Sequence, residues 1–222
     1  MKRFESWVVE RAVQKLELGF AEGVLMPTWF TSDHHFGHTN IIKYCNRPFN
    51  SVSHMNAVME SSWNRVVAPN DIVYYLGDFA MHPQLVTETL PRLKGTKILI
   101  AGNHDRCHPK IGNSERWLPV YREAGFSSVH TELEIEIAGQ TVLLHHFPYR
   151  AETEPQQKYY SQRPVDQGGW LIHGHVHDRW QFSGRQINVS VENWDFEPVS
   201  LAVLASYIET GPRAIEDARA YD

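Results

Sequence analysis

Residues 28–40 read TWFTSDHHFGHTN, an apolar run that stops at a polar cluster. From Asp33 to His38 the chain places one carboxylate and three imidazoles. Four later segments repeat the pattern: DIVYYLGD (71–78), TKILIAGNHD (96–105), TVLLHHFP (141–148) and GWLIHGHVH (169–177). A short apolar run bounded by polar residues predicts a buried strand that leads into a loop. We therefore predict five strands that each end at a loop rich in Asp, Asn or His.

The segments between the strands favour helices in the first half of the chain. Apolar residues recur at helical spacing over 53–67, with Ser53 as the expected N-cap, and residues 85–93 predict a second helix. Strands that alternate with helices predict an α/β fold, a layered sandwich.

The second half is richer in strands. Residues 132–137, ELEIEI, alternate polar and apolar side chains, and the AGQ that follows is a turn after which TVLL returns as a hairpin partner. Residues 186–191, QINVSV, and 199–204, VSLAVL, predict another strand pair. Residues 149–169 contain two prolines and few aliphatic side chains, which predicts a long surface loop near the site.

The N-terminal segment has a helical pattern. Apolar residues at roughly helical intervals over 5–18 predict an amphipathic helix that ends near Gly19. We expect a single domain over residues 1–222, with this helical extension at about 1–26 packed on it.

The composition excludes several classes of protein. An apolar fraction of 42% with 21% charged residues is typical of a soluble globular chain. The net charge of −5 lacks the positive excess that nonspecific duplex binding needs. Cys45 and Cys107 are the only cysteines, so no disulfide framework is indicated. The charged N-terminus matches neither a signal peptide nor a membrane span, so we expect a cytoplasmic protein without a membrane partner.

The polar clusters have the composition of a metal site. In open α/β sheets, ligand sites form at the carboxyl ends of the strands. In extended chain, residues two apart share a face, so Asp33 can point with His35, and His175 with His177, while His34 faces away and tolerates substitution. One such cluster alone is also typical of a solvated surface loop. Five together offer carboxylates, an amide and imidazoles without thiolates, which favours a hydrolytic site with divalent ions.

These clusters resemble the signature of the calcineurin-like metallophosphoesterases, which reads D-x-H, G-D, G-N-H-D/E, a lone H and G-H-x-H. The matching positions occur in the same order over residues 28–178: Asp33 with His35, Gly77-Asp78, Gly102-Asn103-His104-Asp105, the pair His145-His146, and Gly174-His175-Val176-His177. The resemblance implies a four-layer αββα sandwich of two mixed β-sheets flanked by helices.

The resemblance also implies the role of each matching residue. One metal ion would be held by Asp33, His35 and His177, and the other by Asn103, His146 and His175. Asp78 would bridge the two ions, with a bridging hydroxide as the nucleophile. His104 would be catalytic, protonating the leaving oxygen, with the carboxylate of Asp105 as its orienting partner.

Other positions are less determined by sequence. His145 and His146 point to opposite strand faces, and the family's lone histidine precedes an aromatic residue, which favours His146 as the ligand. His173 falls outside the signature and favours a structural role. Candidate substrate-binding residues are His38, Asn40, Arg47 and Arg150, although either arginine is equally typical of an ordinary surface.

The sequence therefore predicts a dinuclear metal-dependent phosphohydrolase for phosphate mono- or diesters. A phosphodiesterase with a small, nucleotide-like substrate is favoured. Two divalent ions are expected, Mn²⁺ first, with Fe, Ni or Zn also compatible with these ligands. The alternatives are a nuclease acting on DNA or RNA, which would need a basic track, and a catalytically silent metal-binding scaffold of the same fold.

Overall fold

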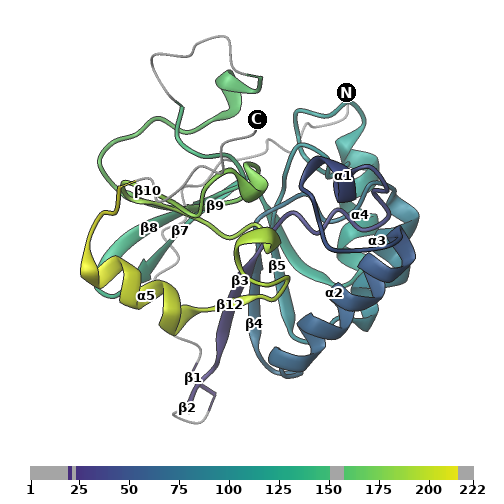
Figure 1. The fold of residues 1–222 in the computed structure, drawn as a ribbon, viewed down its shortest axis with the longest axis horizontal. Coiled ribbons are helices and arrows are strands. Elements are labelled where there is room, and N and C mark those ends of the chain that lie inside the picture. The colour runs from purple at the N-terminus through teal and green to yellow at the C-terminus, as the bar shows by residue number, and fades with distance from the viewer. Residues whose placement is uncertain (1–19, 22–23, 151–157, 215–222) are drawn as a thin grey trace, which may run out of the picture.

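The protein is described by a computed structural model that covers residues 20–21, 24–150 and 158–214. Two five-stranded β-sheets face each other, and helices flank them (Figure 1). Both sheets mix parallel and antiparallel strands. This arrangement confirms the predicted α/β sandwich of two mixed sheets flanked by helices.

The first sheet has the strand order β12-β3-β4-β5-β6. Its strands are β3 (Thr28–Thr31), β4 (Ile72–Tyr75), β5 (Thr96–Ile100), β6 (Phe126–His130) and β12 (Val199–Ser200). β3 to β6 run parallel, so the carboxyl ends of β3, β4 and β5 lie along one edge of the sheet. β12 pairs antiparallel with β3.

The second sheet has the order β10-β11-β9-β8-β7. Its strands are β7 (Glu132–Ile137), β8 (Gln140–His145), β9 (Trp170–His173), β10 (Phe182–Ser183) and β11 (Gln186–Asn188). β7 and β8 form the predicted hairpin, whereas β8 and β9 run parallel and end together.

The helices cover the first sheet on one face. They are α1 (Ile41–Tyr44), α2 (Val52–Val66), α3 (Pro83–Thr89) with the 3-10 turn Leu90–Arg92, and α4 (Ser114–Ala124), which the sequence analysis missed. The N-cap of α2 is Ser51 rather than Ser53, because the Ser51 side chain accepts a hydrogen bond from the backbone of His54.

Strand alternation divides the apolar residues between two cores. On β4, Val73 and Tyr75 pack against α2, α3 and α4, whereas Tyr74 faces the second sheet. The helical core buries Met55, Met59 and Trp63, which recur at intervals of four along α2. Both faces of the first sheet are therefore buried. The sheet is thus a rigid support for the loops at its edge.

The predicted C-terminal strand pair is wrong. β11 and β12 lie in different sheets, and the chain after β12 forms α5 (Leu201–Thr210). The Ser200 side chain caps this helix by accepting from the backbone of Val203, and Leu204 and Ile208 enter the core between the sheets. The apolar run 199–204 thus has the pattern of a buried helix as well as that of a strand.

Most of the predicted N-terminal extension lies outside the described residues. The helix expected over 5–18 lies outside the described residues. After it, β1 (Phe20–Ala21) pairs antiparallel with β2 (Val24–Leu25). In the loop after β8, the described residues include a 3-10 turn, Tyr160–Gln162. Among the helices of the described residues, none is long and apolar enough to cross a membrane.

Candidate metal centre and active site

The five predicted clusters meet at one place, between the two sheets. β3, β4 and β5 end beside one another and deliver Asp33, Asp78 and Asn103, and the parallel pair β8 and β9 delivers His146 and His175 from the other sheet. These side chains line or underlie a single cleft of about 750 Å³. The convergence follows from parallel pairing, because parallel strands bring their carboxyl ends to the same edge.

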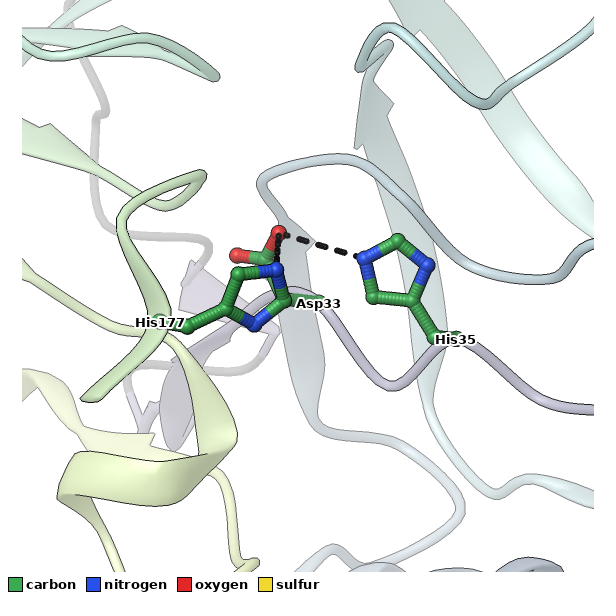
Figure 2. A group of neighbouring side chains, drawn as sticks. All are labelled: Asp33, His35 and His177. Atoms are coloured by element: carbon green, nitrogen blue, oxygen red, sulfur yellow. Dashed lines mark ion pairs between the residues drawn. The ribbon is translucent and has the colours of Figure 1, made fainter. Parts of the chain in front are cut away.

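The first group of candidate metal ligands consists of Asp33, His35 and His177 (Figure 2). Nε2 of His35 lies 3.9 Å from Oδ1 of Asp33, and Nε2 of His177 lies 4.0 Å from the same oxygen. Asp33 Oδ1 and both ring nitrogens of His35 are buried without a hydrogen-bond partner. Buried polar atoms are rarely left unpaired, so the unpaired Oδ1 of Asp33 facing the unpaired Nε2 of His35 fits a divalent cation.

The other oxygen of Asp33 is held by the protein. Oδ2 accepts hydrogen bonds from the hydroxyls of Ser32 (2.6 Å) and Ser190 (2.9 Å) and from the backbone N–H of His175 (2.9 Å). Three donors on one oxygen fix the carboxylate and leave Oδ1 directed at the two imidazoles. Sequence reasoning missed Ser32 and Ser190, because a single serine does not form a recognisable sequence motif.

The second group consists of Asp78, His146 and His175. Nδ1 of His146 lies 2.7 Å from the carbonyl oxygen of Leu76, and since a carbonyl only accepts, Nδ1 carries the proton and Nε2 is a free lone pair. Oδ1 of Asn103 lies 3.1 Å from that Nε2. Two acceptors this close repel each other unless a cation lies between them, so this pair also fits a metal ion.

Asp78, a member of the second group, lies between His35 and His146. Its Oδ2 is 3.5 Å from Nε2 of His35 and 3.6 Å from Nε2 of His146. Burial and the nearby Asp33 carboxylate raise the pKa of Asp78 well above its usual value. Two buried carboxylates without positive charge are unfavourable, and a cation on either side of Asp78 removes that cost. The predicted ligand set is therefore brought together in two groups about one carboxylate.

The electrostatics of the imidazoles agree with this arrangement. Burial, with His177 and Arg47 contributing, holds the pKa of His35 well below its usual range, so its imidazole is neutral and one ring nitrogen has a free lone pair. Burial also acts to lower the pKa of His177, but Glu192 and Asp33 outweigh it and raise that pKa. The same negative surroundings favour any cation at Nε2 of His177, a proton or a metal ion.

The ligands do not lie on extended chain, which corrects the geometric premise of the sequence analysis. Asp33 and His35 have φ values of 59° and 52°, and His175 and His177 have 72° and 52°. Their side chains converge through left-handed turns rather than strand alternation. Non-glycine residues adopt this region rarely and at a cost, and they cluster at functional sites.

Glycines allow the loops to approach one another. A Cβ on Gly174 would lie 2.3 Å from Oδ2 of Asp33, and one on Gly102 would lie 2.3 Å from Oδ1 of Asp78. Gly77 has φ +91°, and its Cβ would meet the Nδ1 atom of His146 at 2.6 Å. The glycine of each motif is therefore required by the closeness of the neighbouring ligand.

His104 is the motif residue that faces the cleft without belonging to either group. Its side chain is 40% exposed, its ring centroid lies 5.1 Å from that of His35, and its backbone N–H donates to Oδ1 of Asp78 at 2.8 Å. Burial, with the charges of His146, His38 and Lys158, lowers the pKa of His104 to about 4. An anionic ester beside the ring would oppose that lowering, because negative charge favours the imidazolium.

Asp105 does not have its predicted role. Its buried carboxylate accepts the backbone N–H groups of Asp78 (2.8 Å), Phe79 (3.1 Å) and Gly102 (2.8 Å). Asp105 therefore ties the loop after β4 to the loop after β5, and acts on the site by positioning Asp78 rather than by orienting the His104 side chain.

Arg47 is also misassigned, because its guanidinium is fully buried beneath the site. It donates to the carbonyl oxygens of Asp33 (2.6 Å) and His34 (2.7 Å) and forms an ion pair with Glu192 (2.6 Å). Oε1 of Glu192 in turn lies 2.9 Å from Nδ1 of His177. Arg47 and Glu192 thus hold the ligand loop and orient His177. No short motif marked Glu192 in the sequence.

Of the remaining candidate substrate-binding residues, one lines the cleft and two do not. His38 lines the cleft, with its ring 5.4 Å from that of His35. Arg150 lies outside the cleft, with its guanidinium 5.5 Å from the ring centroid of Tyr160, and Asn40 is exposed at the start of α1 away from the cleft lining. The structure therefore gives neither Arg150 nor Asn40 a contact with a ligand in the cleft.

The histidines beside the ligands are structural. His34 points away from the site as predicted, but it is fully buried, with Nδ1 2.8 Å from the Tyr75 hydroxyl, so we now expect its substitution to be costly. His145 is buried and accepts from the backbone of Phe147, and His173 packs against Trp180.

Comparisons with known proteins show the family to which the chain belongs. The sequence profile described as calcineurin-like phosphoesterase matches residues 26–202. The chain belongs to this family of metal-dependent phosphoester hydrolases. It is 36% identical over 201 residues to the uncharacterized protein MJ1445 of Methanocaldococcus jannaschii, covering 85% of this chain and 96% of that protein.

Two further proteins are similar. The Gene 66 protein of Mycobacterium phage L5 is 33% identical over 185 residues, which is 75% of this chain and 87% of the phage protein. Among solved structures, the protein of unknown function AQ665 from Aquifex aeolicus superimposes with a TM-score of 0.59 at 30% identity, covering 82% of this chain and 99% of that one. These similarities support the fold and the family, and none of the three names a substrate.

Proposed function

We propose that the protein is a dinuclear phosphohydrolase, in which two divalent ions are held on either side of Asp78. Asp33, His35 and His177 hold one ion, and Asn103, His146 and His175 hold the other. The observation that carries the proposal is the position of Asp78 Oδ2, which lies 3.5 Å from Nε2 of His35 and 3.6 Å from Nε2 of His146. Mn²⁺ is our first candidate, since nitrogen and oxygen ligands without thiolate suit it; Fe, Ni and Zn suit the same set.

The chemistry divides between the ions and the chain. When bound, such a pair of ions supplies an activated water and stabilises the charge of the phosphoryl oxygens. His104, exposed to the cleft and anchored through its backbone to Asp78, is placed to donate a proton to the leaving oxygen. His38 lies on the wall beside His35 and contacts the substrate in this account.

The proposed substrate is a small phosphate ester, with a nucleotide-like phosphodiester favoured. A cleft of about 750 Å³ falls within the range of small-molecule sites. The two other readings are a nuclease on DNA or RNA, which the net charge of −5 disfavours, and a silent scaffold, which has no reason to keep His104 in the cleft. Cys45 and Cys107 are free buried thiols, which accords with our proposal of a cytoplasmic location.

The test is a hydrolysis screen with purified, metal-free protein. Monoesters, linear and cyclic phosphodiesters, dinucleotides and short nucleic acids are each incubated with Mn²⁺, Fe²⁺, Ni²⁺ or Zn²⁺. We expect an aryl phosphodiester or monoester to be cleaved with added Mn²⁺ and a chelator to abolish the activity. Undiminished activity in metal-free protein would contradict the mechanism, and preference for long nucleic acids would favour the nuclease.

A further inference from the structure

One wall of the cleft is built from residues outside the metallophosphoesterase signature. Lys158 and Tyr159 follow β8 in the chain and line the cleft together with His104 and His175. Lys158 is exposed, and its Nζ lies 4.9 Å from the centroid of the Tyr159 ring. A cation held over an aromatic face has a restricted position, which distinguishes this lysine from one that is free in solvent.

Tyr159 packs against Phe147 and against His175 of the second group. Its ring centroid lies 5.3 Å from that of Phe147 and 5.7 Å from that of His175. Its backbone has φ 65°, a conformation in which a bulky residue is rare and persists only where the surroundings enforce it. The tyrosine thus sets where Lys158 stands relative to the metal centre.

Lys158 and His104 line the same cleft. The other charged side chains that line the cleft are Arg163, Arg179, Asp78 and Asp178. Since Asp78 belongs to the metal centre, cations outnumber acids on the walls, although the chain as a whole has a net charge of −5.

We propose that Lys158, positioned by Tyr159, forms a subsite for an anionic substituent on the leaving group of the substrate. The inference rests on the proposed function, in which His104 faces the leaving oxygen: a cation on the wall of the same cleft meets the next part of the leaving group. The substrate class is then a phosphoester whose leaving group carries its own negative charge, as the phosphate or carboxylate of a nucleotide-like group does.

The test measures binding, so that it does not depend on turnover. Phenylphosphonate and 4-phosphonobenzoate differ by one carboxylate on the ring, and neither is hydrolysed. Their dissociation constants are measured by calorimetry with the Mn²⁺-loaded protein, and then with Lys158→Ala, Lys158→Arg and Tyr159→Phe. Arg116→Ala is the matched control, because Arg116 is an exposed cation on α4 outside the cleft lining.

We expect wild type to bind 4-phosphonobenzoate at least about threefold more tightly, the gain of one partly exposed ion pair. Lys158→Ala should remove that preference, whereas Lys158→Arg, Tyr159→Phe and Arg116→Ala should keep it. Equal binding of the two ligands by wild type, or an undiminished preference in Lys158→Ala, overturns the subsite alone. A parallel loss for both ligands in Lys158→Ala places the amine on the scissile phosphoryl group and overturns it too. If neither phosphonate binds, the proposed function fails as well.

Discussion

The guanidinium of Arg47 and the carboxylate of Glu192 form a buried ion pair, with Nη2 2.6 Å from Oε1. The two residues are 145 positions apart in the chain, and the pair joins the segment after α1 to the 3-10 turn Val191–Asn193. Nδ1 of His177 lies 2.9 Å from the same oxygen. The positions of Asp33 and His177 therefore both depend on this ion pair, which links the segments that carry them.

Removing Arg47 should be costly. Arg47→Ala leaves Glu192 buried without its cation and frees two carbonyl oxygens, so we expect a loss of about 3–5 kcal/mol in the free energy of unfolding. Denaturant unfolding of metal-free protein measures this directly. Arg65→Ala, at an exposed ion pair with Glu197, is the comparison and should cost less than about 1 kcal/mol. Equal costs for the two variants would contradict the structural role of Arg47.

Glu192→Gln should weaken metal binding while the fold is kept. The amide is the same size, but it no longer favours a cation at His177 or fixes which ring nitrogen carries the proton. Changes in groups that orient metal ligands commonly cost about 10–100-fold in affinity. A Mn²⁺ titration should show one of two binding steps weakened, and unchanged affinity at both steps would refute the role.

His34→Ala should destabilise the protein without touching the metals. The imidazole is fully buried, stacks 5.1 Å from Phe36 and meets the Tyr75 hydroxyl, so its removal leaves a cavity and an unpaired group. We expect about 2–5 kcal/mol by thermal or chemical unfolding, as for other large buried side chains. His82→Ala, at an exposed position, should stay within about 0.5 kcal/mol. A neutral His34→Ala would mean that the site tolerates substitution after all.

Gly174→Ala should displace Asp33. The added Cβ would lie 2.3 Å from Oδ2 of Asp33, and the backbone on either side is fixed, so the carboxylate must move. Lower Mn²⁺ affinity, read by titration, is the expected result. Gly112→Ala, where a Cβ meets nothing within 4 Å, should match wild type. If both variants bind metal equally, the close packing at Gly174 is not needed for the site.

His104→Ala should separate catalysis from metal binding. We expect turnover to fall by about 10²–10⁴-fold, because a proton donor to the leaving oxygen is removed. Metal content, measured by elemental analysis, should stay near that of wild type, since His104 belongs to neither ligand group. Loss of the metals in this variant would show that its role is misassigned.

The sequence predicted the convergence of the site because the relevant signals are local. Apolar runs ending in Asp, Asn or His mark strand ends, and parallel pairing then brings Asp33, Asp78 and Asn103 to one edge whatever the loops do. The local backbone geometry could not be predicted from the sequence. The left-handed turns at Asp33 and His35 go with hydrogen bonds from their backbone N–H groups to the carbonyl oxygens of Gly77 and Asp78, which lie at the end of the neighbouring strand.

Residues that act through distant partners were missed or misplaced. Arg47 looked like a surface cation because its partner Glu192 lies far along the chain, and nothing near either residue indicates the pairing. Residues 201–204 continue an apolar run, and only their place above the inter-sheet core decides that they are helical. Lys158 and Tyr159 carry no pattern, and their position beside His175 comes from tertiary packing alone.

The most direct test of the account is the electron paramagnetic resonance spectrum of metal-free protein loaded with two equivalents of Mn²⁺. Two ions on either side of Asp78 lie close enough to couple, so we predict a multiline signal from an exchange-coupled pair, with both ions retained after desalting. Asp78→Asn should lose that signal. A spectrum of isolated Mn²⁺, or retention of a single ion per chain, would contradict the dinuclear centre.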